Sequence, residues 1–163
     1  MRNEISDAYL SRPAEMLVLK GYRHWTMGIV TQEVSYWNDA WNLFATILGS
    51  KKASHAMDAM INFVKTLGLC ASCPLKTYTP DCAGLCRDEC LVLGLISGIQ
   101  YSDQEAVELC LRALTCQSRC DEVSLAAGMF ALALKSSGLM LCPIPATVLN
   151  EVIGNKMPST TIH

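Results

Sequence analysis

The chain has 163 residues, a length typical of a single domain, and 51% of them are hydrophobic whereas only 17% are charged. Disorder is excluded, because disordered chains combine low hydrophobicity with high charge. Thirteen Lys and Arg face fifteen Asp and Glu, so we expect no nucleic-acid partner, which would need a broad basic surface. The composition predicts a globular domain with a large core or an adhesive surface.

No leader or membrane segment is expected from the sequence. Charged residues interrupt the first twenty positions, whereas a secretory signal needs an uninterrupted apolar run. The longest apolar candidates, Leu91–Gln100 and Val123–Leu134, are shorter than the ~18–20 residues that cross a bilayer. We therefore expect a cytoplasmic protein without a membrane partner, whose nine cysteines are reduced thiols.

Helical signals divide the first part of the chain into three segments. Pro13 opens a predicted helix that Gly21 ends. Thr31 is expected to cap a second helix, which carries an apolar stripe and stops at Gly49. A third helix is predicted over 50–68, with apolar residues recurring at helical spacing.

An irregular stretch over 69–79 precedes a long predicted helix, 80–100. Thr79 is expected to cap it, with Pro80 in the first position. The half from 91 to 99 has no charge, so it should be buried on all sides. The adjacent cluster Arg87–Glu89 is expected on a solvated face or at a helix start.

The remainder of the chain is also predicted to be helical. Ser102 and Glu105 have capping-box spacing and predict a helix to about Cys116. Another helix is expected over 121–137, and a short one ends at Gly154. The fold class is therefore all-α: a single compact bundle of six to seven helices around a buried central helix at about 80–100. It occupies 1–154, and 155–163 is expected to be a frayed tail.

Cysteines are the feature most suggestive of chemistry. One pair lies in the irregular stretch and three more follow at spacings of four, which would align them on one helix face. Two thiols in a loop followed by helical thiols resemble the ligand sets of Zn²⁺ or Fe–S sites, and a thiolate stripe also suits Cu(I). The candidate ligands are Cys70, Cys73, Cys82, Cys86 and Cys90.

Two other interpretations of the thiols stay open. Free cysteine packs as a small hydrophobe, so these residues can simply belong to the core. Redox chemistry is the third interpretation, although no strand precedes Cys70 as in a thioredoxin-type motif.

Two further patterns could mark contacts. Gly94 and Gly98 share one helix face and leave backbone uncovered, which favours close packing within the domain or between two subunits. The aromatic and basic cluster Tyr22–Trp25 is expected to pack at a helix junction, with ligand stacking as the alternative.

These patterns lead to one functional hypothesis and one alternative. We expect a non-enzymatic helical protein that acts through protein–protein association, most simply as a homodimer, because so little charge leaves apolar surface exposed. The alternative is a cysteine-thiolate protein that binds Zn²⁺, an Fe–S cluster or Cu(I). No catalytic constellation is recognisable, so an enzyme ranks third.

Overall fold

The computed structural model describes residues 11–154, and within them the chain forms an all-α bundle, as the sequence predicts. Its elements are α2 (Pro13–Thr31), α3 (Val34–Leu48), α4 (Ser50–Cys70), α5 (Arg87–Gln100), α6 (Gln104–Leu114), the 3-10 turn η1 (Gln117–Arg119), α7 (Cys120–Ser136) and α8 (Ala146–Gly154). No strand occurs in this range, and none of its helices is long and apolar enough to cross a membrane. The predicted tail 155–163 lies outside the described residues.

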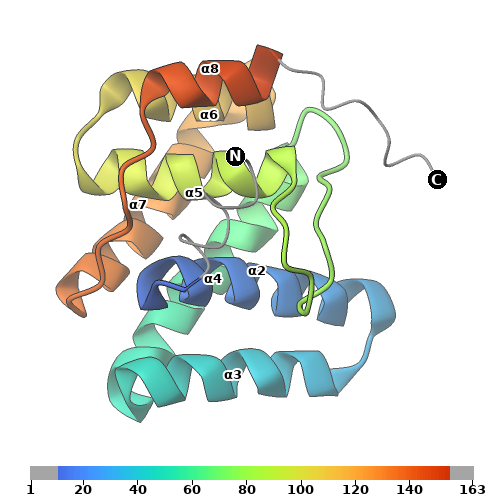
Figure 1. Cartoon of the computed structure of the whole chain (residues 1–163). Coiled ribbons are helices and arrows are strands. Elements are labelled where there is room, and N and C mark those ends of the chain that lie inside the picture. The colour runs from blue at the N-terminus through green and yellow to red at the C-terminus, as the bar shows by residue number, and fades with distance from the viewer. Residues whose placement is uncertain (1–10, 155–163) are drawn as a thin grey trace.

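Helix α5 lies in the middle of the bundle. It packs against α2, α6, α7 and α8, and Figure 1 shows it between the α6–α8 layer and α2, with α4 and α7 behind. Every residue from Leu91 to Gly98 is buried. The predicted enclosure of the charge-free segment is thus confirmed, with Ile99 the partly exposed exception.

The central helix begins at Arg87, so the prediction of a start at position 80 is wrong by seven residues. Thr79, the expected cap, lies in a turn instead, where its carbonyl accepts a hydrogen bond from the Cys82 amide. The N-cap is Cys86, and Glu89 accepts a hydrogen bond from the Cys86 amide at 3.1 Å to complete a capping box. The helix thus starts at a local capping box, and residues 80–85 stay outside it.

An ion pair buried between α2 and α5 supplies the reason. Arg23 donates from Nε and Nη2 to the two carboxylate oxygens of Glu89, each at 2.8 Å. The guanidinium also donates to the carbonyls of Cys82 and Gly84. Inside a helix those carbonyls would accept from amides four residues later. Arg23 therefore holds this segment in an irregular path.

Glu89 lies in the first turn of α5, as expected for a cluster at a helix start, but it is fully buried and not on a solvated face. Besides Arg23, the Thr77 hydroxyl and the Tyr78 amide donate to it, each at 2.9 Å. Burial alone raises the pKa of a carboxyl, but the hydrogen bonds from Arg23, Tyr78 and Cys86 hold the pKa of Glu89 below its usual value. One carboxylate thus secures the loop between α4 and α5.

Two predicted helix ends are wrong because the glycines concerned lie inside helices. Gly21 continues α2, and a Cβ there would lie 2.7 Å from the Phe44 ring, so the glycine allows α3 to approach. Gly68 likewise falls within α4. Thr31 is the last residue of α2 and not a cap; Gln32, with φ of 59°, ends that helix.

The later boundaries depart less from expectation. Asp103, and not Ser102, caps α6, since its carboxylate accepts from the Ala106 amide at 3.2 Å. Helix α6 stops at Leu114, two residues before the predicted end. Helix α8 covers Ala146–Gly154, up to the last described residue, so the predicted end at Gly154 stays a prediction.

The glycine pair of α5 makes contacts within the domain. A Cβ at Gly94 would lie 2.7 Å from Leu149 Cδ2 of α8 and 3.0 Å from Cys110 Sγ of α6. One at Gly98 would lie 3.0 Å from Val107 Cγ2. The close approach inferred from the spacing is therefore internal, and the subunit-contact interpretation of this pair is wrong.

Candidate interaction surface and thiol positions

The outer face of α7 is an uncovered apolar stripe. Leu125, Met129 and Leu132 are 71%, 55% and 65% exposed, and their spacing places them on one side of the helix. The opposite side is buried against α4 and α5, with Phe130 stacked on Phe63 at 6.1 Å between ring centroids. Helix α7 thus has apolar residues on both sides, and among residues 11–154 only one side has neighbours that cover it.

Charges flank this stripe at both of its ends. From Val123 to Leu134 no residue of α7 is charged, whereas Asp121 and Glu122 stand in the first turn and Lys135 stands in the last. Asp121 lies one turn before Leu125, so it shares the outer face of the helix. The face is therefore acidic at one end, neutral in the middle and basic at the other.

A glycine lies midway along the charge-free part of α7, beside the exposed stripe. Gly128 is midway between Asp121 and Lys135 in sequence, and a Cβ built there would meet no atom within 4 Å. Unlike Gly94, it therefore answers no packing requirement within residues 11–154. Glycine inside a helix costs ~1 kcal/mol relative to alanine, so its presence needs another reason.

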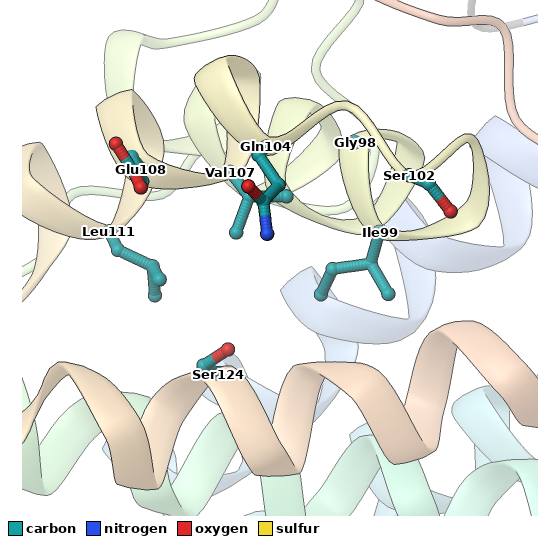
Figure 2. A pocket seen from close by; sticks show the side chains of 8 residues that line it. All are labelled: Gly98, Ile99, Ser102, Gln104, Val107, Glu108, Leu111 and Ser124. Atoms are coloured by element: carbon teal, nitrogen blue, oxygen red, sulfur yellow. The ribbon is translucent and has the colours of Figure 1, made fainter.

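A pocket of about 360 Å³ adjoins the same helix. Figure 2 shows Ile99, Val107 and Leu111 pointing from α5 and α6 toward Ser124 of α7. The rim is polar, and its contributors include Ser102, Gln104 and Glu108. The surface next to the stripe is consequently hollowed, with an apolar floor.

A second group of exposed apolar residues lies at the turn between α2 and α3. Val30 and Val34 are 74% and 60% exposed there. Trp25 and Trp37 pack close by at a tilt, with ring centroids 5.5 Å apart. The cluster Tyr22–Trp25 lies inside α2, so the prediction of a helix junction at these residues is wrong. No charge pattern comparable to that of α7 borders this group, since α2 and α3 lack basic residues in their last turns and α3 lacks acidic ones in its first.

Three cysteines lie around α5: Cys86 and Cys110 are buried, and Cys90 is half-buried against the same core. Burial raises the pKa of Cys86 to about 12, that of Cys90 to about 11 and that of Cys110 to about 12. The Cys86 thiol lies 3.2 Å from the Lys76 carbonyl, and Cys110 interacts electrostatically with Cys90. These are neutral core thiols of the kind that packs as small hydrophobes.

A different thiol group lies where the end of α4 meets the start of α7. Cys70 is buried, and its sulfur lies 3.7 Å from a carboxylate oxygen of Glu122. Cys116 is exposed, and Cys120 Sγ lies 2.9 Å from the Thr115 hydroxyl. Arg119 interacts electrostatically with both Cys70 and Cys116.

The five candidate metal ligands are spread over separate surroundings. Cys82 and Cys86 precede α5, so the predicted helical stripe with Cys90 is wrong. Cys70 interacts with Glu122 and Cys116, while Cys73 is exposed in the loop. Among residues 11–154 no three or more His, Cys, Asp or Glu side chains are grouped so as to hold a metal ion. Metal binding stays a prediction, and elemental analysis of protein purified without oxygen tests it.

Within the described residues the protein is all-α, with an exposed apolar face on α7 and both buried and exposed thiols. No protein-family model, curated protein or solved structure shows significant similarity to this chain.

Sequence reasoning missed the roles of Gly128 and Arg23. Gly128 carries a recognisable signal, because it interrupts a charge-free helix midway between an acidic and a basic end. Arg23 offers no such signal, since its partner Glu89 is 66 residues away in the chain.

Proposed function

We propose that the protein associates with a second copy of itself through the outer face of α7. The observation that carries this proposal is the exposure of three large apolar side chains, Leu125, Met129 and Leu132, on one side of a charge-free helix. Burying apolar surface contributes roughly 25 cal/mol per Å², and exposed patches of this kind mark interaction sites. A cytoplasmic location with reduced thiols is part of the same proposal.

The distribution of charge favours a second copy as the occupant. In an antiparallel pair of α7 helices, Lys135 of one copy faces Asp121 and Glu122 of the other. Asp121 and Lys135 are separated by 14 positions, which is about 21 Å along the axis. A two-fold axis through the middle of α7 therefore places opposite charges together at both ends, as a self-complementary interface requires.

Gly128 fits the crossing point of such a pair. The two-fold axis passes beside the residue midway between Asp121 and Lys135, and that residue is glycine. Without side chains there, two helix backbones can approach closely, as small residues allow at other helix crossings. A single helix face is smaller than a standard interface, so we expect a Kd on the order of micromolar.

Sedimentation velocity over a concentration series tests the proposal. We expect the unmodified chain to form dimers at tens of micromolar and Leu125→Lys to be monomeric, because a charge would be buried in the interface. Val30→Lys is the matched control, since Val30 is equally exposed, at 74%, on a distant face. If the unmodified chain is a monomer at all concentrations, the proposal is contradicted. It is also contradicted if Leu125→Lys and Val30→Lys weaken the dimer equally.

Charge exchange tests the antiparallel arrangement. Lys135→Asp and Asp121→Lys should each weaken the dimer, because each brings like charges together at both ends. The double variant Asp121→Lys with Lys135→Asp restores opposite charges and should recover association. If the double variant dimerises more weakly than either single variant, the antiparallel arrangement is ruled out. Dimerisation through the outer face of α7 in another arrangement is then decided by the Leu125→Lys comparison.

A further inference from the structure

The end of α4 and the connection before α7 run side by side at one point. Ala71 and Thr115 form an isolated antiparallel bridge. The Cys116 amide donates to the Cys70 carbonyl at 2.9 Å, and the Ser72 amide donates to the Leu114 carbonyl at 3.2 Å. The register therefore places Cys70 and Cys116 opposite each other.

This register brings the two cysteines within the separation that a disulfide needs. A full antiparallel hydrogen-bonded pair has Cα atoms about 5.5 Å apart, inside the ~4.4–6.8 Å range of disulfides, and Cys70 and Cys116 form one of the two bonds of such a pair. Cys116 Sγ lies 3.8 Å from the Ala71 carbonyl, next to Cys70, and the two thiols interact electrostatically. Because Cys116 is exposed, its side chain can rotate toward Cys70 without moving the backbone.

The surroundings distinguish the roles of the two thiols. Cys116 is open to a soluble reagent, whereas Cys70 is only 1% exposed and can be reached only from within the protein. Burial raises the pKa of the Cys70 thiol and the Arg119 guanidinium opposes this rise, so Cys70 suits the inner position better than the position that attacks first. Cys116 therefore has the position of the thiol that reacts first with a reagent, and Cys70 has the position of the thiol that resolves the mixed disulfide.

We propose that Cys70 and Cys116 form a reversible disulfide by exchange with a low-molecular-weight disulfide such as oxidised glutathione. The Cys116 thiolate attacks one sulfur of the reagent, which forms a mixed disulfide and releases one glutathione thiolate. Cys70 then loses its proton and attacks Cys116 Sγ, and this releases the second glutathione thiolate. Two electrons pass from the protein thiols to the reagent, and the two protons end on the two released thiols.

The bond has a predictable structural effect. It would tie the end of α4 to the segment leading into α7 and close a loop that contains the whole of α5 and α6. Cross-links of long loops stabilise chiefly by restricting the unfolded chain. Because the register already matches, we expect a rise in Tm of about 5 °C or more on oxidation and no loss of helix.

Incubation of the native, reduced protein with oxidised glutathione tests the proposal. After acid quenching and alkylation of the remaining thiols, peptide mass spectrometry should find Cys70 and Cys116 joined, with glutathione absent from the product. A stable mixed disulfide on Cys116 with Cys70 still alkylated would overturn the proposal. A bridge from Cys116 to Cys120 or Cys73 would overturn it equally.

Two variants give a matched comparison, because Cys73 and Cys116 are both exposed. Cys116→Ser should abolish the Tm rise on oxidation, whereas Cys73→Ser should retain it. An equal rise in both variants would contradict the assignment. The test is independent of dimer formation, since it reads a bond within one chain, and intrachain linkage is verified by electrophoresis without reductant.

Discussion

Helices α5 and α7 look alike in sequence and differ in their surroundings. Each contains a charge-free apolar run with glycine inside it and acidic residues in its first turn. The protein encloses α5 on every side, whereas α7 keeps Leu125, Met129 and Leu132 in solvent. The glycines follow the same division, because Gly94 has Leu149 against it and Gly128 has open space.

The difference teaches that an apolar, charge-free helix indicates a need for burial without specifying what provides it. Helix α5 meets that need with neighbours from its own chain. Helix α7 meets half of it with α4 and α5, and we propose that a second copy provides the remainder. Variants at equivalent positions of the two helices should therefore behave differently.

The largest difference in stability is expected between variants of the acidic residues in the first turns of α5 and α7. Glu89→Gln leaves Arg23 buried without a counter-charge, and loss of one partner of a buried pair costs about 3–5 kcal/mol. Glu122→Gln is the matched change on α7, where the carboxylate and its partner Arg119 are exposed, and it should leave Tm nearly unchanged. Thermal denaturation of the two variants measures the contrast; equal losses would show that the Arg23 pair does not hold α5.

At the glycines, Gly94→Leu is expected to overpack the contact with α8. A Cβ alone would lie 2.7 Å from Leu149 Cδ2, so the full side chain should cost about 1–3 kcal/mol despite its better helix propensity. Because the contact is internal, the fall in Tm should be the same at every protein concentration. A Gly94→Leu variant that melts higher than the parent would show that α5 is not enclosed there.

Acid should remove the stability that the buried Glu89 carboxylate contributes at the start of α5. The folded-state pKa of Glu89 is below the ordinary value of 4.5, so its contribution is fully present above that pH. As the pH falls below 4.5, the unfolded chain takes up the proton first, and this stability is lost through the folded pKa. Urea denaturation at pH 6 and pH 3 should show a smaller acid loss in Glu89→Gln than in the parent.

Substitution of Gly128 is expected to stabilise the folded monomer, in contrast to Gly94→Leu, which destabilises it. Gly128→Leu gains about 0.8–1 kcal/mol of helix propensity and meets no atom of its own chain within 4 Å, so the monomer should melt higher. The same side chain would separate two α7 helices, and the variant should be monomeric in sedimentation. Retention of the dimer would place the crossing point elsewhere.

The smallest effect concerns thiol reactivity. Cys90 and Cys110, whose pKa values burial raises to about 11 and about 12, should react slowly with iodoacetamide at pH 8. Cys73 and Cys116 are exposed and should react first. Mass spectrometry over a time course separates the two sets; comparable rates would show that the interior opens readily to solvent.

The sequence by itself determined the elements of this protein. Helical periodicity, the cap at Gly49 and the charge-free run of α5 depend on residues a few positions apart, so they predict an all-α bundle with a buried centre. The spacing of Gly94 and Gly98 likewise revealed a close contact, although it left the partner open.

Tertiary structure alone decided where distant residues meet. Arg23 shifted the start of α5 through a carboxylate 66 residues away, and a bridge between Ala71 and Thr115 set Cys70 opposite Cys116. Which face of α7 stayed uncovered was also undetermined by its own residues. Local periodicity fixes which side chains share a face, but coverage depends on how many neighbours the rest of the chain can supply.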